Sequence, residues 1–597
     1  MSSLRVTTAS VSLGDDNLEQ LGSTEAIFPQ GVEGEMRATA LVLEAGARLC
    51  FVSCDCIVVT AAMAHEAAER IAAEGWVPRD NILICPTHTH HAYATIDVLG
   101  LVSHKEFVRR IVEATVLAVK AAVEKLQDPA ATHMDLDAEL LLGVGNEATV
   151  GRNSRVLLKD GSIGWWGYEE EDVVRPTGPL DPSIPIIAFR RPSGKLGAIM
   201  YNRAVHNIGA LKAGVISPGT YGLVAQELEK RHGAATLYFP GAIGSSHNVT
   251  HTGSGAPTDE AMVRLLDAVE RGLDGAKAGL VGPVRSLRRP FSYRVREFDE
   301  ATEAAKVEQY SKRYLGASAE SNMRVMDGQR AELAPLQGEE RQAWLQVFRL
   351  GEIAIVGVPC EFFARLGMAI QQRSPFRHTF IYGLANDDFG YVGDREGLEI
   401  GGYQMWVGPH CSGAPGTGEA MVEQVLAMLE ELQAEDLPAL VDPPALRELR
   451  ADDGLGLQKF YNGTGQQVRY WFNPLGWNAT LEQCEGVCQE ASRGDRYDVV
   501  LDNGRQIVGW AFLMKLDQPL AYLGIGITDA YCSKGLGKIL MQALEDYAKS
   551  HGHEGMDLIV VQDNPRAKAL YERFGFVVTE AFTAADGREF YRMVAKF

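Results

Sequence analysis

The stretch Cys532-Ser-Lys-Gly535-Leu-Gly537-Lys-Ile539 places two glycines between an apolar run and a helical pattern. The apolar run before it, Tyr522-Leu-Gly-Ile-Gly-Ile-Thr528, predicts a strand. After it, apolar residues recur with helical spacing, at Leu536, Ile539, Leu540, Ala543, Leu544 and Tyr547. A glycine turn that joins a strand to a helix N-terminus gathers free backbone N–H groups and the positive end of the helix dipole. The stretch therefore predicts a phosphate-binding turn.

A second segment, Asp563-Asn564-Pro-Arg-Ala-Lys-Ala-Leu-Tyr571-Glu-Arg-Phe-Gly575-Phe576, predicts a short capped helix. Asn564 is a good N-cap, the proline after it suits the first helical position, and Gly575 marks the end. A lone Gly-x-Gly turn is weak evidence of a nucleotide site, and this helix strengthens it.

Together the two segments resemble the GNAT N-acetyltransferase family, over roughly the last 140 residues of the chain. The resemblance implies that the C-terminal region binds acetyl-CoA through Ser533, Lys534, Gly535, Leu536, Gly537, Lys538 and Asn564. Tyr571 matches the position whose phenol often protonates the departing CoA thiolate; its alternative is ordinary packing on a helix face. The sequence departs from the family at Cys532, where arginine or glutamine is usual. Because backbone amides make most of the phosphate contacts, binding is expected to survive with weaker affinity.

The composition is that of a globular chain: 597 residues, 46% apolar and 23% charged. A net charge of −21 argues against nucleic acid or an anionic membrane as a partner. We find no apolar run of about twenty residues and no export signal, so we expect a cytoplasmic protein without a membrane span. The nine cysteines show no disulfide framework, which fits a reduced compartment.

Prolines and charges concentrated at 436–454 predict a linker between two domains, at 1–435 and 455–597. In the first domain, buried strand patterns alternate with amphipathic helix patterns, which is typical of an α/β fold. The expected strands lie at 48–59, 82–85, 196–205 and 353–358, and the expected helices at 61–73, 107–125 and 418–432. The order of the strands is not readable from these patterns.

Histidines and a glutamate follow three of these predicted strands, at the positions where α/β folds place their sites. His88 and His90 follow the strand at 82–85, His206 follows the strand at 196–205, and Glu361 follows the last. On an extended backbone His88 and His90 would point into one pocket, and His91 away from it. Imidazole nitrogens with a carboxylate oxygen suit Zn²⁺, and an open coordination position would let the ion activate water. Each piece alone is more often structural.

Several motifs, in the same order, resemble the neutral (alkaline, non-lysosomal) ceramidase family over most of residues 1–430. They are Thr87-His88-Thr-His90, Val205-His206, Val358-Pro-Cys-Glu361, Asn386-Asp-Asp-Phe-Gly-Tyr391 and Gly402-Tyr403. The resemblance implies a single zinc held by His88, His206, Glu361 and Tyr391. It also implies that His90 is a catalytic or substrate-binding partner beside the metal and that Tyr403 is a second tyrosine of the pocket. Phenolate is an unusual zinc ligand, and the alternative for Tyr391 is a packed aromatic with a satisfied hydroxyl.

Two departures from that family bear on the substrate. Its usual Gly-Asp-Val-Ser-Pro-Asn stretch is here Gly241-Ala-Ile-Gly244-Ser-Ser-His-Asn248, so the aspartate and proline are missing and the serine is displaced. The chain also continues into an acetyltransferase-like region instead of an extra β-rich domain. Ceramide is therefore a poor candidate substrate.

The expected fold is α/β, a large multi-layer zinc-hydrolase-like domain followed by a small mixed α/β GNAT domain. The leading hypothesis is a bifunctional enzyme that hydrolyses an N-acyl amide with zinc and acetylates an amine with acetyl-CoA. Alternatives are a catalytically silent ligand-binding module, or a zinc enzyme that forms an amide or ester, serving the acetyltransferase. The sequence names neither small-molecule substrate and leaves the oligomeric state open, a homo-oligomer included.

Overall fold

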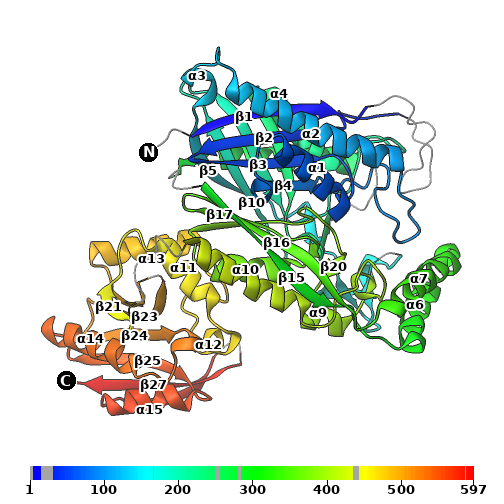
Figure 1. Cartoon of the computed structure of the whole chain (residues 1–597). Helices are drawn as coiled ribbons and strands as arrows, with labels where there is room; N and C mark the ends of the chain where they lie inside the picture. The colour runs from blue at the N-terminus through cyan, green and yellow to red at the C-terminus, as the bar shows by residue number, and fades with distance from the viewer. Residues whose placement is uncertain are drawn as a thin grey trace. The chain divides into compact units, whose positions relative to one another are not determined.

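The computed structural model describes residues 4–14, 31–165, 167–248, 256–279, 284–433, 441, 443–504, 506–584 and 587–597. The chain divides into two compact units, Met1–Leu432 and Gln433–Phe597 (Figure 1). Both contain helices and strands, so the predicted α/β class is confirmed. Of the predicted linker, residues 436–440 and 442 lie outside the described residues. No described helix has both the length and the apolar character needed to cross a membrane.

The first sheet of the N-terminal unit has the order β1-β2-β3-β4. Its strands are β1 (Arg5–Ser12), β2 (Arg37–Ala45), β3 (Ala47–Cys54) and β4 (Ile82–Pro86). The first three strands are antiparallel, whereas β3 and β4 are parallel. A parallel pair needs a crossover connection, and helix α1 (Ala61–Ala73) supplies it, capped by the Thr60 side chain.

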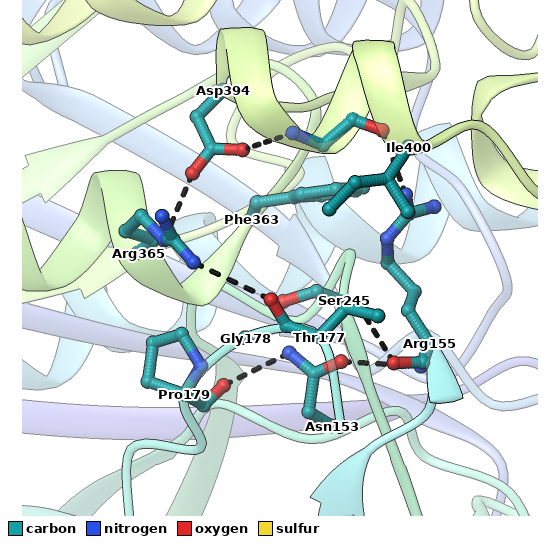
Figure 2. A pocket seen from close by; sticks show the side chains of 11 residues that line it. Asn153, Arg155, Thr177, Gly178, Pro179, Ser245, Phe363, Arg365, Asp394 and Ile400 are labelled. Carbon is teal, nitrogen blue, oxygen red and sulfur yellow. Dashed lines mark hydrogen bonds and ion pairs between the residues drawn. The ribbon is translucent and has the colours of Figure 1, made fainter. Parts of the chain in front are cut away.

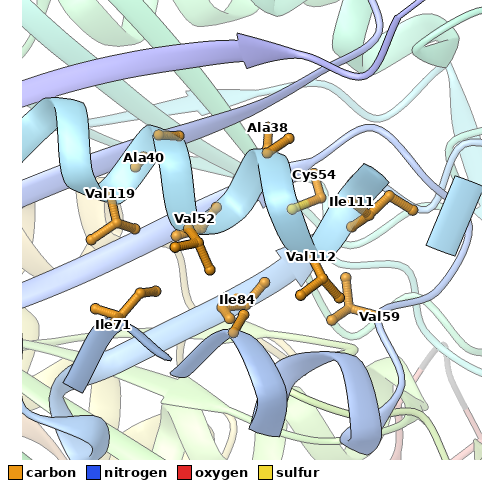
Figure 3. Close-up of a cluster of buried hydrophobic side chains, with 14 of the residues drawn as sticks. Ala38, Ala40, Val52, Cys54, Val59, Ile71, Ile84, Ile111, Val112 and Val119 are labelled. Atoms are coloured by element: carbon orange, nitrogen blue, oxygen red, sulfur yellow. The ribbon is translucent and has the colours of Figure 1, made fainter. Parts of the chain in front are cut away.

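Helix α1 and helix α2 (Lys105–Gln127) cover one face of this sheet (Figures 1 and 3). The side chains that fill the space between the sheet and the two helices include Ala38, Val52 and Ile84 from the strands and Ile71, Val112 and Val119 from the helices. Burying one apolar stripe of each helix in this way is what holds the helices on the sheet.

Two further sheets complete the scaffold of this unit. The second has the order β12-β11-β10-β5-β14 and the third β15-β16-β17-β19. The second sheet comprises β5 (Glu139–Asn146), β10 (Ser183–Arg190), β11 (Leu196–Arg203), β12 (Ala235–Pro240) and β14 (Lys277–Ala278), and α4 (Gly219–His232) and α5 (Ala256–Asp274) pack with it. The third comprises β15 (Val284–Arg294), β16 (Glu340–Leu350), β17 (Ile353–Gly357) and β19 (His378–Tyr382), with α8 (Ala364–Arg373) and α10 (Thr417–Gln433).

The three sheets meet in one apolar cluster, so the unit has several layers around a shared interior. Side chains from all three contribute to it: Leu41, Phe51 and Leu83 from the first, Phe189, Met200 and Phe239 from the second, and Phe348, Ile355 and Phe380 from the third. The rings of Phe51 and Phe348 lie 5.0 Å apart, centroid to centroid. This packing fixes the strand ends relative to one another.

Shorter elements connect and flank these sheets. The strands are β6 (Gly151–Asn153), β7 (Val156–Leu158), β8 (Ile163–Gly164), β9 (Val173–Pro176), β13 (Ser246–Asn248), β18 (Glu361–Phe362) and β20 (Tyr391–Val392). The helices are α3 (His133–Leu136), α6 (Glu300–Tyr314), α7 (Ala319–Leu333) and α9 (Arg395–Ile400). Strands β18 and β20 pair in parallel, and β13 pairs with β6.

Two predicted strands end at least two residues earlier than expected. The strand predicted at 48–59 stops at Cys54, because the chain turns at Asp55, whose N–H donates to Arg37 O at 3.0 Å while its carboxylate accepts Arg37 N–H. The strand predicted at 196–205 stops at Arg203. His206 consequently lies in the loop that follows β11 rather than at the strand end itself.

The C-terminal unit is built on one sheet with the order β21-β22-β23-β24-β25-β27-β26. Its strands are β21 (Ala445–Glu448), β22 (Tyr497–Asp502), β23 (Ile507–Met514), β24 (Leu520–Ile527), β25 (Gly555–Val561), β26 (Val577–Thr583) and β27 (Glu589–Lys596). Its helices are α11 (Gly454–Gly463), α12 (Gln466–Trp471), α13 (Leu481–Arg493), α14 (Leu536–Ser550) and α15 (Pro565–Arg573). Strand β21, which lies inside the range predicted as a linker, pairs with β22.

Helices α14 and α15 pack on one face of this sheet, and α11 and α13 pack on the other. The parallel strands β24 and β25 pair only at their beginnings, from Leu520 to Tyr522 against Gly555 to Asp557. Beyond Tyr522 no pairing joins the two strands, so they diverge and open the sheet toward the start of α14.

Replacing Ile71 by alanine tests the packing of α1 on the first sheet. Ile71 is fully buried, and truncating a buried isoleucine costs about 2–5 kcal/mol of folding free energy. We expect Ile71→Ala to lower the melting temperature of the N-terminal unit in calorimetry. The control Val102→Ala removes methyl groups from a side chain that is 79% exposed and should change the melting temperature little. Equal melting temperatures for the two variants would contradict the assignment.

Candidate functional sites

Two of the predicted ligands, His88 and His206, are held in one orientation each by backbone carbonyl groups. His88 Nδ1 lies 2.8 Å from Ile57 O, and His206 Nδ1 lies 2.9 Å from Ser246 O and 3.1 Å from Ile243 O. A carbonyl oxygen only accepts, so each Nδ1 carries a proton, and each ring in its neutral form offers a lone pair at Nε2.

Glu361 and Tyr391 are brought together by the pairing of β18 with β20, in which the two residues are direct partners. Glu361 Oε2 lies 2.8 Å from His206 Nε2 and 3.8 Å from His88 Nε2. The Tyr391 hydroxyl hydrogen-bonds to Glu361 and lies 3.4 Å from His206 Nε2. The structure thus gathers all four predicted zinc ligands, from loops and short strands far apart in the sequence.

His90, predicted as a partner beside the metal, lies within ligand range. Its Nε2 is 3.3 Å from His88 Nε2, and His88, His90 and His206 form a group whose ligand atoms all lie within 4.8 Å of one another. The backbone at His88 is not extended as predicted but left-handed, with φ of 55°. The two rings meet through this turn instead of through strand alternation. His91 leaves the group, because its Nε2 accepts the Gly209 N–H at 3.0 Å.

Burial dominates the electrostatics of this cluster. It lowers the pKa of His88 to about 4 and the pKa of His90 well below its usual value. Burial alone would raise the pKa of Glu361, but the hydrogen bond and charge of His206 hold it below the usual range. Burial and the charge of Glu361 raise the pKa of Tyr391 well above 10. Neutral imidazoles beside an ionised carboxylate are the protonation states that bind a cation.

The residues present fit a divalent metal ion. Zn–N distances of 2.0–2.1 Å in a tetrahedral site place the ligand atoms about 3.3 Å apart, and the contacts above run from 2.8 to 3.8 Å. Glu361 Oε2 is buried, and it faces His206 Nε2 at 2.8 Å. Two lone pairs at this separation repel unless a proton or a metal cation lies between them. Nitrogen-rich donors of this kind suit zinc better than magnesium or calcium.

Tyr403, the other predicted pocket tyrosine, lies beside this cluster on an aromatic wall. Its ring stacks on Trp165 at 3.9 Å and 9°, and its pKa is raised by burial and by Glu361. Arg155 holds the segment behind it: Nη1 donates to Gln404 Oε1 at 3.3 Å and Nη2 to Gly401 O at 2.6 Å. Sequence patterns gave no sign of this buried arginine.

The hollow beside Arg155, drawn in Figure 2, is lined by Ser245, Phe363, Arg365 and Asp394 among others. Its volume is about 20 Å³, enough for one water molecule. Arg365 pairs with Asp394 at 3.0 Å across it. This hollow is therefore too small to hold a substrate.

The loop Gly241–Asn248, in which this chain departs from the ceramidase pattern, positions the ligands. Ser246 O and Ile243 O orient His206, and a Cβ at Gly244 would lie 2.2 Å from Glu361 O. The same loop adds a histidine that the sequence analysis did not select. The His247 ring lies 4.1 Å from the His206 ring, and its buried Nε2 has no hydrogen-bond partner among the described residues. The available sequence signal for His247 was its place directly after Ser245 and Ser246, in the stretch that departs from the ceramidase pattern.

In the C-terminal unit, a cleft of about 800 Å³ opens where β24 and β25 diverge. Most of the predicted cofactor-binding residues and Tyr571 line it: Ser533, Gly535, Gly537, Lys538 and Asn564. Two do not. Leu536 is buried in the core, and Lys534 places Nζ 4.9 Å from the Tyr531 ring.

The turn before α14 has the backbone geometry of an anion site. Ser533 and Gly535 both have positive φ, 62° and 81°, and Gly535 is the N-cap residue. The first N–H groups of the helix have no intrahelical acceptor and point toward the turn. Arg566, from α15, donates to Ser533 Oγ at 3.1 Å and brings a positive charge to a turn in which Cys532 supplies none.

The second capped helix also follows its prediction. Asn564 caps α15 by accepting the Ala567 N–H at 3.1 Å, and Gly575 ends it with φ of 79°. Tyr571 lies on this helix at the cleft. Its burial, and to a smaller extent the neighbouring Tyr522, raise its pKa above 10. Its hydroxyl is therefore protonated at neutral pH and is available as a proton donor.

Comparisons with known proteins identify the class of each unit. Residues 466–576 match the model of the acetyltransferase (GNAT) family. Mycothiol acetyltransferase from Corynebacterium glutamicum (strain R) is 33% identical over 97 residues, which are 15% of this chain. The chain spans about a third of the length of that relative. The C-terminal unit therefore contains a GNAT acetyltransferase domain, as predicted.

The N-terminal unit is similar in structure to a different class of protein. The crystal structure of neutral ceramidase from Pseudomonas aeruginosa matches with a TM-score of 0.57 and 18% identity, over 73% of this chain and 75% of that one. A structure of ceramidase complexed with C2 matches with a TM-score of 0.56 and 19% identity, over 73% and 76%. At this identity the likeness shows the fold, so the N-terminal unit is a neutral ceramidase-like α/β domain.

Gly535→Val tests the turn before α14. We expect at least about tenfold weaker acetyl-CoA binding in calorimetric titration, because a branched side chain strains the positive φ and crowds the free N–H groups. Gly552→Val is the matched control: its φ is 77°, it too has open space around it, and it lies outside the cleft. Equal affinities for the two variants would show that the turn does not bind the cofactor.

Proposed function

We propose that this chain is a bifunctional enzyme. Its C-terminal domain would transfer acetyl from acetyl-CoA to an amine, and its N-terminal domain would hydrolyse an N-acyl amide with zinc. One observation supports the second activity above all others, the convergence of Glu361 Oε2 on the Nε2 atoms of His206 and His88, at 2.8 and 3.8 Å. The absence of disulfides among the nine cysteines, all described and all free, supports a reduced compartment such as the cytoplasm.

In the amidase site, His88, His206 and Glu361 would hold the ion, with Tyr391 or His90 as the fourth ligand. A zinc ion bound there would supply Lewis-acid polarisation of the amide carbonyl and an activated water. The carbonyl groups of Ile57, Ile243 and Ser246 keep the two histidine rings from turning. His90, neutral at pH 7, can take a proton at a ring nitrogen and return it to the leaving amine. Tyr403 would close the pocket on the aromatic side.

In the acetyltransferase site, the turn at Ser533–Lys538 would bind the pyrophosphate and the open edge of β24 would bind the extended arm of the cofactor. Beyond Tyr522 that edge has no strand partner, so its backbone groups are available to a ligand. Tyr571, protonated at neutral pH, would give its hydroxyl proton to the departing thiolate sulfur.

Joining the two activities in one chain has a chemical logic. Amide hydrolysis releases an amine, and acetyl transfer consumes one. A deacylate-then-acetylate sequence follows if the amine released by the first domain is accepted by the second. The fusion itself is the observation that supports this step.

Zinc content tests the amidase half. Protein purified without added metal should carry about one zinc per chain by elemental analysis, and His206→Ala should lose it. The control His65→Ala replaces an exposed histidine of α1, with 59% of its side chain accessible, and should keep it. His90→Ala separates two roles: loss of zinc would make His90 a ligand, whereas retained zinc without hydrolysis would make it the proton carrier.

The alternatives predict other results. Protein that neither contains zinc nor takes it up would favour a silent ligand-binding module, with acetyl transfer unchanged by His88→Ala. A zinc enzyme that forms its bond would yield an amide or ester when supplied with the separate halves, and product analysis would detect it.

Tyr571→Phe tests the proton donor of the acetyltransferase half. Removing a general acid typically costs about 10²–10⁴-fold in rate, so we expect a fall in kcat of at least about 100-fold with little change in the KM for acetyl-CoA. Tyr547→Phe, on α14 and stacked on Tyr497 away from the cleft, should leave kcat unchanged. A Tyr571→Phe enzyme with full kcat would remove the proposed role.

A further inference from the structure

The cleft of the C-terminal unit has two sides, and the side away from α14 and α15 is where an acceptor amine would lie. We call it the acceptor face and define it by Phe472, Phe512, Met514, Tyr522, Ile559, Arg588 and Phe590, all of which line the cleft. Alternation along the strands sets this face apart. Tyr522, for example, packs with the α11 and α13 cluster, whereas its neighbour Leu523 packs with α14.

The acceptor face is apolar and aromatic apart from one cation. Among the described residues that line the cleft, none is an aspartate or glutamate, and the charged ones are Lys538, Arg566, Arg573 and Arg588. The first two lie beside the turn that would take the pyrophosphate. Arg588 alone among the four comes from the tip of the β26–β27 hairpin, next to Phe590 on the acceptor face.

Arg588 is held in place by its surroundings. Its Nη1 donates to Tyr470 O at 2.8 Å, and its guanidinium lies 5.2 Å from the Phe590 ring centre and 5.6 Å from the Tyr470 ring centre. These contacts tie the hairpin tip to α12 and keep the planar group at the cleft wall. A guanidinium held in this way is suited to paired hydrogen bonds with a carboxylate.

One carboxylate of the protein, that of Asp557, lies near the acceptor face but does not line the cleft. It is the direct partner of Tyr522 where β24 and β25 still pair. Burial raises its pKa, and the charges of Lys515 and Arg592 oppose that effect. With two cations beside it, Asp557 offers little attraction to a polycationic acceptor.

From these features we infer that the acceptor is an amine with an aromatic or apolar body and a carboxylate near the amino group, and that Arg588 binds that carboxylate. This inference rests on the proposed acetyltransferase function and adds the chemical class of its acceptor. In the transfer, the amine nitrogen bonds to the acetyl carbon and the C–S bond breaks, the thiolate takes the Tyr571 proton, and the amine gives up a proton to water, from which Tyr571 is reprotonated. A cationic wall also favours the neutral, reactive amine over the ammonium ion.

Three related compounds test the acceptor class. L-phenylalanine carries the carboxylate, L-phenylalaninamide has an uncharged amide in its place, and phenethylamine has neither group. Spermidine represents a polycation. We measure kcat/KM for each as CoA thiol release and confirm the products by mass spectrometry. A charge-assisted pair of hydrogen bonds should favour L-phenylalanine over both analogues by at least about tenfold.

Arg588→Gln should reduce that preference to within about twofold while leaving the KM for acetyl-CoA unchanged, which a general loss of folding would not do. The matched control is Arg592→Gln on the same strand, because Arg592 pairs with Glu580 and does not line the cleft. The control should keep the wild-type preference.

Three results would overturn the inference: a preference for phenethylamine or spermidine, a preference that survives Arg588→Gln, or no acetylated product from any of the four compounds by protein that binds acetyl-CoA. Acetyl-CoA binding, measured separately by calorimetric titration, distinguishes these from failure of the function itself. Protein that does not bind acetyl-CoA would refute the acetyltransferase proposal, and the acceptor class with it.

Discussion

His206 Nε2 faces a carboxylate oxygen of Glu361 across 2.8 Å in a buried part of the N-terminal unit. This contact constrains much of the surrounding structure. The loop at 241–248 turns so that two carbonyl groups fix the His206 proton on Nδ1, and β18 pairs with β20 so that Glu361 and Tyr391 arrive together. Isolated buried charges are costly, so an arrangement of this kind, assembled from several separate segments, suits a bound cation.

The C-terminal unit depends on a different constraint, an interruption of sheet pairing. Between β24 and β25 the ladder ends after Tyr522, and the chain that leaves β24 leads to the glycine turn at which α14 begins. The separation leaves unpaired backbone groups beside a helix N-terminus, which would be unfavourable without a ligand. The two units thus share a principle: each withholds internal partners from polar groups at the place where chemistry is proposed.

Local patterns predicted much of this from the sequence. The helix at 61–73 was predicted with its observed bounds, and the glycine turn, the cap at Asn564 and the end at Gly575 were found as expected, because each depends on neighbouring residues. What depends on distant contacts was not predictable. The turn at Asp55 needs Arg37, the left-handed backbone of His88 has no local signature, and Arg155 and His247 matter only through what packs against them. The site residues selected in the N-terminal unit came together for a topological reason, since the ends of buried strands converge.

The close approach at Gly244 has a consequence for sequence variation at this position. Any side chain there would strike the backbone oxygen of Glu361, because a Cβ would stand 2.2 Å from it. The residue at position 244 and the place of β18, which carries Glu361, are therefore coupled. A serine at that position would require β18 to shift, and with it β20 and Tyr391. The backbone of β18 therefore limits position 244 to glycine as long as the loop and the strand keep their present places.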